Sequence, residues 1–186
     1  MKINISGRLS LLFLVLIIFI CVNSAQGQSH DTAIPIGESI KTQVNSGMSD
    51  PYDATITILE VVRGTAAWKL IKKADPSNQK PDKGYEYIMI RISFKMKARV
   101  LPGKGTFDLD WPLQLTTFSE DFEEYTSPDV VTPEPVFKRT VKADEYAEGW
   151  IVRVVKKEDK RPLLLFDPAS GGAWARGKIR FFKLYK

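Results

Sequence analysis

The sequence predicts an all-β protein, an immunoglobulin-like antiparallel β-sandwich with one short helix. About seven short stretches alternate apolar and polar residues with the period of β-strands, and turn-forming residues separate them. Only one stretch has a helical period, so the alternation of strands and helices that builds a parallel sheet is absent. No pair of cysteines brackets a tryptophan, which excludes an antibody-type domain.

Residues 1–27 have the three parts of a secretory signal peptide. Lys2 and Arg8 supply the positive start, residues 11–22 form an unbroken apolar run, and residues 23–27 are small or polar. The run is shorter than the roughly 20 residues that a membrane-spanning helix needs. We therefore expect a secreted, extracellular protein with no stable membrane span after cleavage, and association with the cell envelope stays open.

Cleavage is expected after Gly27, with cleavage after Ala25 as the alternative. Two other outcomes stay open. The segment could be kept as a membrane anchor if the helix tilts and the bilayer thins. Cys21 could carry a lipid, but the residue before a lipidated cysteine is normally small, and here it is Ile20. Cleavage lowers the net charge from +5 to +3 and leaves no cysteine, so the core alone must hold the domain together.

The remaining chain is long enough to form one domain with its own core. Residues 28–50 are polar and are interpreted as a linker with a short edge strand at about 34–42. Residues 51–186 are assigned to the sandwich. Its first strong strand covers residues 52–63, where the apolar positions change parity near Leu59, and a β-bulge explains this change.

Residues 65–74 form the single predicted helix. Thr65 is the expected N-cap, and Asp75 and Pro76 end the helix. Trp68 lies off the apolar stripe. That stripe contains four residues: Ala67, Leu70, Ile71 and Ala74.

Residues 85–100 form the clearest strand. Every second residue from Ile88 to Ala98 is apolar, and the residues between them are mostly cationic or polar. This pattern predicts a sheet that packs on one side and is solvated on the other. Further strands are expected at about 107–115, 136–141, 150–154, 163–166 and 179–185, with turns at 102–105 and 119–124 and a basic hairpin loop at 156–161.

Four short motifs occur in an order that resembles a known family. They are Ile34-Pro35-Ile36-Gly37, Val61-Val62-Arg63-Gly64, Pro81-Asp82-Lys83-Gly84-Tyr85-Glu86-Tyr87 and Glu148-Gly149-Trp150-Ile151-Val152. In this order they resemble the telokin-like immunoglobulin-fold domain family of secreted bacterial proteins. Over residues 33–185 the chain is similar to the mycobacterial immunoprotective extracellular antigen. The resemblance implies the fold and the extracellular location, and it implies no catalytic residue. Many members are lipid-anchored, and this chain departs from them in the residue before Cys21.

The sequence offers few groups for catalysis. The single histidine, His30, lies near the expected mature N-terminus, where it is poorly placed for Ser–His–Asp or Cys–His chemistry. Zinc and copper ligand sets and a glycine-rich phosphate loop are missing. A carboxylate-dependent hydrolase that uses Asp108 and Asp110 ranks last, because these residues mark the solvated face of a strand. We expect no enzyme, no cofactor and no metal. Calcium binding by the acidic turn at 119–124 stays open, although its spacing matches no EF-hand loop.

Four tryptophans are candidates for a sugar-binding platform. Trp111 and Trp150 are in phase with apolar neighbours, and we expect both in the core. Trp68 lies off the helix stripe and Trp174 lies in a glycine-rich turn, so these two are the candidate contact residues. The alternative is that each covers an edge of the core.

A second set of candidate contact residues is basic and shares one strand face: Arg91, Lys95, Lys97 and Arg99. Such a face could bind an acidic protein or an anionic envelope polymer. The alternative is that it keeps the protein soluble and prevents unwanted strand pairing. A mature net charge of +3 and the lack of an aromatic–basic motif argue against nucleic acid.

Together these observations predict a secreted, non-enzymatic interaction module that binds another protein at the cell surface or in the medium. The alternative is a binding module for cell-wall glycan or another anionic polymer.

Overall fold

The structure is a computed structural model that describes residues 30–46, 50–99, 105–109, 114–137, 140–168 and 179–186. The chain divides into two compact units, Met1–Thr32 and Ala33–Lys186. In the first unit the described residues are 30–32, of which His30 and Asp31 are helical. None of the helices in the described part has the length and apolar character needed to cross a membrane.

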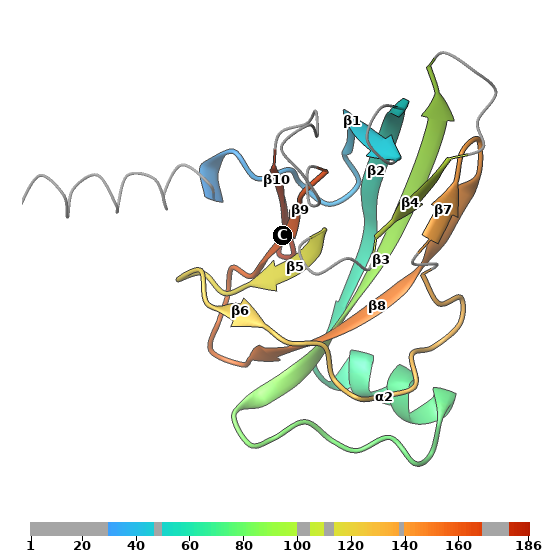
Figure 1. Cartoon of the computed structure of the whole chain (residues 1–186). Coiled ribbons are helices and arrows are strands. Elements are labelled where there is room, and N and C mark those ends of the chain that lie inside the picture. The colour runs from blue at the N-terminus through green and yellow to red at the C-terminus, as the bar shows by residue number, and fades with distance from the viewer. Residues whose placement is uncertain (1–29, 47–49, 100–104, 110–113, 138–139, 169–178) are drawn as a thin grey trace, which may run out of the picture. The chain divides into compact units, whose positions relative to one another are not determined.

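The larger sheet of the second unit has the strand order β1-β2-β3-β8, and its strands are antiparallel (Figure 1). They are β1 (Ser39–Ser46), β2 (Asp50–Arg63), β3 (Tyr85–Ala98) and β8 (Tyr146–Lys156). β2 and β3 lie at the centre, and β1 and β8 lie at the edges.

The edge strand expected at about 34–42 begins later, at Ser39. Gly37 adopts a φ of +92°, which turns the chain before the strand, and its N–H binds the carbonyl of Ile58. Ile34 instead pairs with Phe182 of the other sheet.

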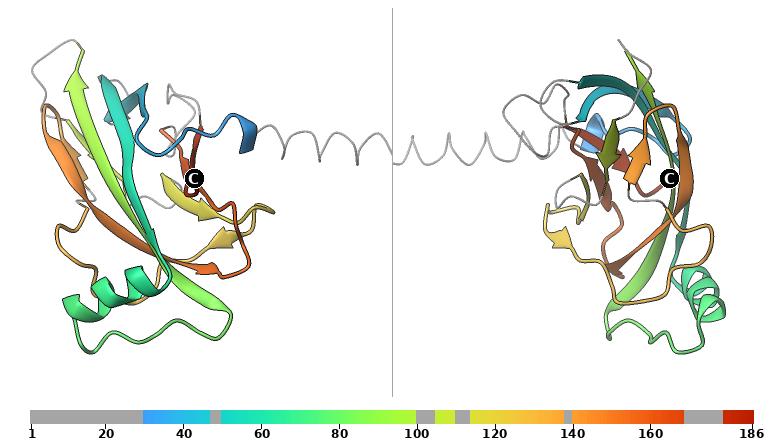
Figure 2. Two further views of the ribbon diagram at one scale, coloured as in Figure 1. Left: turned by 180° about the vertical axis from the view of Figure 1, so that it is seen from behind. Right: turned by 45° about the vertical axis from the view of Figure 1, so that its right-hand side comes forward.

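The second sheet has the order β10-β9-β5-β6, and a two-stranded sheet joins β4 to β7. Their bounds are β4 (Thr106–Asp108), β5 (Leu115–Phe118), β6 (Glu124–Tyr125), β7 (Thr140–Lys142), β9 (Leu163–Phe166) and β10 (Arg180–Lys183). Figure 2 shows the two main sheets as separate layers. The predicted fold class, an all-β antiparallel sandwich with one short helix, is confirmed. The described residues form ten strands rather than about seven, because the sequence pattern does not reveal the shortest ones.

The main core lies between the two sheets, and Phe94 of β3 is one of its fully buried residues. The Phe94 ring stacks on Phe107 with centroids 5.7 Å apart, and it meets Phe166 edge-on at 6.2 Å. All three side chains are buried. Aromatic packing of this kind joins β3 to β4 and β9, which are remote in the sequence.

The predicted β-bulge is confirmed at Leu59. Ile58 pairs with Ile92 and Glu60 pairs with Arg91, so Leu59 is the extra residue of β2.

Helix α2 (Thr65–Ala74) has the predicted bounds, and Asp75 ends it as expected. The prediction of Thr65 as the N-cap is wrong. Gly64 occupies that position with a φ of +67° and makes no side-chain cap. The buried stripe is also narrower than predicted, since Leu70 is 40% exposed.

The expectation that one side of the larger sheet is solvated is wrong for half of its length. Helix α2 packs on the outer side of the sheet, opposite the second sheet (Figure 2). Ala67 and Ile71 of α2 bury Met89 of β3 and Trp150 of β8. The other half of the outer side has no such cover from the described residues.

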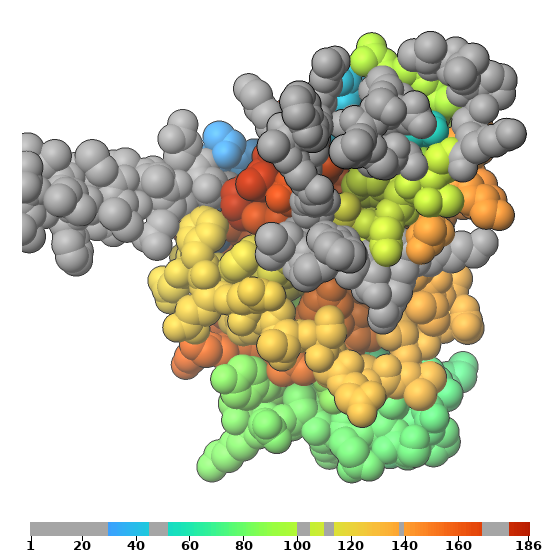
Figure 3. All heavy atoms as spheres, viewed as in Figure 1, coloured from blue at the N-terminus to red at the C-terminus, as the bar shows by residue number. Residues whose placement is uncertain are grey.

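The segment 126–136 runs along the surface next to α2 (Figure 3). Asn78, just after α2, ties this segment to the helix. Its amide nitrogen donates to the carbonyls of Ile71 at 2.9 Å and Val131 at 3.0 Å, and its oxygen accepts from the Val131 N–H at 2.8 Å.

Candidate interaction surface

On the outer side of the larger sheet, residues that pair with one another across the strands form rows. The rows change from apolar to polar along the length of the strands. The row nearest α2 is apolar and contains Val62, Met89 and Val152. The next row contains Glu60, Arg91 and Trp150. Three polar rows follow, and we call them the open face: Ser39–Thr57–Ser93–Glu148, Lys41–Thr55–Lys95–Tyr146 and Gln43–Asp53–Lys97.

A shallow groove crosses the open face. It is lined by Lys41, Thr42, Gln43, Asp53, Ala54, Thr55, Lys95 and Lys97. None of its three lysines forms an ion pair with another residue that the structure describes. Lys41, Lys95 and Lys97 are all exposed, so their charges are available to a partner.

The two arginines among the predicted contact residues are engaged within the protein. Arg91 forms an ion pair with Glu148, lies 4.0 Å from Glu60, and places its guanidinium carbon 6.0 Å from the centre of the Trp150 ring. Arg99 lies 3.3 Å from Asp53. The charges of both arginines are therefore balanced locally, unlike those of Lys95 and Lys97.

Tyr146 and Glu148 form a second feature of the open face. The Tyr146 hydroxyl donates to one oxygen of Glu148, and Arg91 donates to the other. The hydrogen bond from Tyr146 lowers the pKa of Glu148, and Arg91 lowers it further. The same bond raises the pKa of Tyr146. The ring is held at its hydroxyl end while the residue remains 58% exposed.

Trp150 is buried, as predicted, although it packs beneath α2 rather than between the sheets. Trp68 is half-buried and stacks on Tyr87 with ring centroids 6.0 Å apart. The amine of Lys72 lies 5.6 Å from the centre of the Trp68 ring. Trp68 therefore lies at the edge of the cluster under α2. The groove that contains the three lysines lies toward the other end of the outer side of the sheet.

Several predicted positions lie outside the described residues: Cys21, residues 102–104 of the expected turn, Asp110, Trp111 and Trp174. Asp108, the other carboxylate of the hydrolase hypothesis, is exposed on β4.

The acidic turn and the basic hairpin, which the sequence analysis treats as separate candidate sites, contact each other. Lys156 lies 2.5 Å from Glu123, and Arg161 lies 3.2 Å from Glu120. The hydrogen bond to Glu123 raises the pKa of Lys156. Part of the charge of each segment is therefore balanced by the other. Nowhere in the described ranges do three or more His, Cys, Asp or Glu side chains gather closely enough to hold a metal ion.

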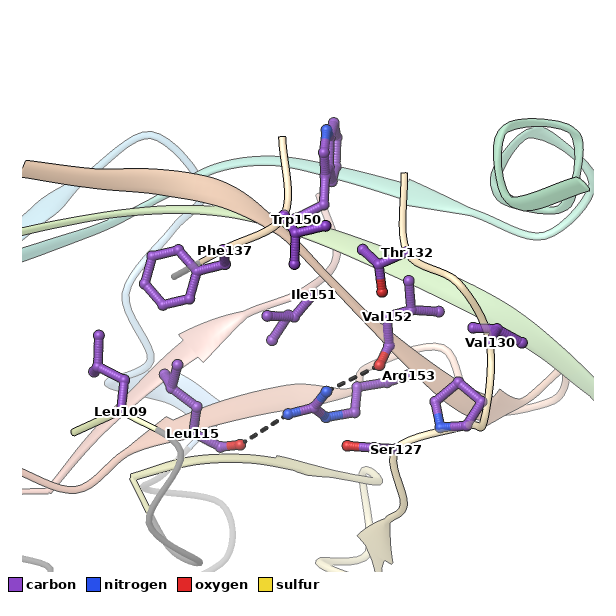
Figure 4. Close-up of a pocket in the computed structure, with 12 residues that line it drawn as sticks. Leu109, Leu115, Ser127, Val130, Thr132, Phe137, Trp150, Ile151, Val152 and Arg153 are labelled. Carbon is purple, nitrogen blue, oxygen red and sulfur yellow. Dashed lines mark hydrogen bonds between the residues drawn. The ribbon is translucent and has the colours of Figure 1, made fainter. Parts of the chain in front are cut away.

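A pocket of about 120 Å³ lies beside β8 (Figure 4). Apolar side chains of Leu109, Leu115, Phe137 and Ile151 line one side of it. The Arg153 guanidinium donates to the carbonyls of Val152 at 2.9 Å and Leu115 at 3.2 Å. Arg153 therefore connects β8 to β5 across the pocket.

No family model matches the sequence, and no curated protein matches it. Two solved structures are similar. The secreted protein MPT63 from Mycobacterium tuberculosis has 12% identity and a TM-score of 0.48, over 80% of this chain and 96% of that one. An uncharacterised β-sandwich protein from Clostridium difficile has 16% identity and a TM-score of 0.41, over 81% and 93%. Both similarities concern the fold alone.

Lys41, Thr55 and Tyr146 also belong to this surface and were not predicted from the sequence. Their association depends on the pairing of four strands, which places them in one row with Lys95. Neither the composition nor the spacing of residues along a single strand predicts this association.

Proposed function

We propose that the chain is a secreted, non-enzymatic module that binds another protein through the open face. The observation that carries this proposal is the groove whose three lysines have no ion pair to any described residue. Unbalanced charges on an otherwise neutralised sheet favour a partner that bears acidic groups.

The mixed character of the open face favours a protein over an anionic polymer. Asp53 lies in the groove beside Lys97, and Glu148 lies in the row next to Lys95. A protein surface can match both signs of charge on this face, whereas a polymer that is anionic throughout matches only the lysines.

The arrangement of the titratable groups supports a role in binding rather than catalysis. Active sites gather such groups in a cavity, where burial and convergence alter their pKa values. The lysines of the open face are exposed in a shallow groove, and the carboxylates beside them are paired with arginines.

A capture experiment tests the proposal. The full chain is immobilised and exposed to proteins from the culture medium and the cell envelope, and the bound proteins are quantified by mass spectrometry. A variant with Lys95→Glu and Lys97→Glu should lose the specific partner by tenfold or more, in the range of hot-spot losses of about 2 kcal/mol. The matched control carries Lys69→Glu and Lys80→Glu, two exposed lysines outside the open face, and should retain it. Equal capture by both variants would refute the proposal.

The same variants test the polymer alternative. Isolated wall polymer is added to the immobilised chain, and binding is measured over a range of salt concentrations. If the polymer binds through Lys95 and Lys97 and no protein depends on them, the anionic-polymer alternative replaces the protein-binding proposal. Capture of a partner protein whose binding requires the two lysines supports the proposal.

Secretion is part of the proposal and rests on residues 1–27. N-terminal sequencing of the protein from the medium should find Gln28 as the first residue, or Gln26 if cleavage follows Ala25. Membrane-bound protein that still begins at Met1 would contradict secretion.

A further inference from the structure

We propose that Tyr146 anchors the partner, and that the partner contributes an extended acidic segment with an apolar side chain at one end. The segment lies across the strands along the row of Lys41, Thr55, Lys95 and Tyr146. This inference rests on the proposed function and specifies which chemistry the open face recognises.

The spacing of the row fits an extended chain. Neighbouring strands lie about 4.8 Å apart, so the three steps from Lys41 to Tyr146 span about 14 Å. In an extended segment, side chains on the same side recur every second residue, and those four residues apart are separated by about 13 Å. If an apolar residue of the segment lies above Tyr146, acidic residues two and four positions further along the segment lie near Lys95 and Lys41, respectively.

Tyr146 is suited to act as an anchor because its position is fixed before binding. Its hydroxyl is held by Glu148, which is itself held by Arg91, while the residue is 58% exposed. A tyrosine ring offers a large contact area, and little conformational entropy remains to be lost when the ring is already held. Buried tyrosines at the centre of interfaces are frequent hot spots.

The residues on either side of the row direct the acidic segment onto it. On one side, Asp53 places a carboxylate between Gln43 and Lys97. On the other side, the neighbouring row contains the hydroxyls of Thr57 and Ser93 and then Glu148. The central row contains two lysines and no carboxylate, so it matches the charge of an acidic segment better than either neighbouring row does.

A synthetic peptide tests the inference. In this peptide, a leucine and two glutamates are separated from one another by single serines. An extended chain therefore presents the leucine and both carboxylates on the same side. Its binding to the full chain is measured by calorimetry. Tyr146→Ala should weaken binding about tenfold and Tyr146→Phe about threefold, because the second variant keeps the ring and loses only its attachment to Glu148. Lys80→Ala is the control and should bind as the unchanged protein does.

Three outcomes decide the result. A peptide whose leucine is replaced by serine should bind the unchanged protein about tenfold more weakly, and this loss should disappear in Tyr146→Ala. Equal binding of the leucine peptide to Tyr146→Ala and to the unchanged protein would overturn the inference. If neither peptide binds while the captured partner depends on Lys95 and Lys97, the inference fails and the proposed function stands. Thermal melts verify that each variant is folded.

Discussion

Met89 and Lys97 lie on the same face of β3, and α2 buries Met89 while Lys97 remains exposed. Met89→Ala should therefore lower the free energy of unfolding by about 2–5 kcal/mol, as truncations in a core do. Lys97→Ala should change it by about 0.5 kcal/mol or less. Urea titrations measure both values. An effect of Met89→Ala as small as that of Lys97→Ala would mean that α2 does not pack on the sheet.

Gly149 lies where the chain at 136–137 comes closest to β8. A Cβ atom at this position would lie 2.3 Å from the Phe137 nitrogen, closer than such atoms approach. Gly149→Ala should destabilise the protein by about 1–3 kcal/mol, in the range of overpacked sites. It should also expose the Phe137 N–H, which binds the Trp150 carbonyl at 3.1 Å, to faster hydrogen exchange. Ser93→Ala on the neighbouring strand is the control and should leave that exchange unchanged.

Asn78 makes three hydrogen bonds that no other residue type reproduces in full. Asn78→Ala should cost about 1–3 kcal/mol, because it removes three hydrogen bonds of a buried side chain, two of which hold the Val131 backbone. Hydrogen exchange should increase in the segment 126–136 more than in the strands. Gln79→Ala is the matched control, since the Gln79 side chain is exposed and its amide bonds only to the Ser77 carbonyl in the same turn. Equal effects of the two variants would show that Asn78 does not hold the segment.

The phenol of Tyr146 should titrate above its ordinary value of 10.0 because of its bond to Glu148. For a group whose folded pKa is raised, the interaction is complete below the ordinary pKa and is lost as the pH rises through the folded pKa. Glu148→Gln removes the nearby negative charge and should move the pKa of Tyr146 back toward 10.0. Ring signals in NMR spectra, assigned by comparison with Tyr146→Phe, follow the titration. An unchanged pKa in Glu148→Gln would contradict the pairing.

Features that depend on local sequence were predictable. The bounds of α2 and β9 follow from periodicity and flanking breakers, and the bulge at Leu59 follows from the change of parity. The alternating apolar side of β3 is buried from Ile88 to Met96, as predicted.

Features that depend on packing between distant elements were not predictable. Met89 and Lys97 have the same parity, and only the position of α2 separates their environments. Arg91 and Lys95 are both basic residues of one strand, yet register places Arg91 next to carboxylates and Lys95 next to Thr55 and Tyr146. The site therefore depends on the register of β1, β2 and β8 as well as on the sequence pattern of β3.

The bulge at Leu59 has a consequence for how such chains change length during evolution. Insertions and deletions are normally tolerated in loops, because a strand that loses one residue turns every following side chain to the opposite face. Here Leu59 has no partner, and Ile58 and Glu60 already pair with consecutive residues of β3. Deletion of residue 59 would restore regular alternation and leave all other pairs of β2 in place. We expect related chains to differ in length at this position inside the strand, and an alignment that moves the gap into a neighbouring loop would misassign the residues between.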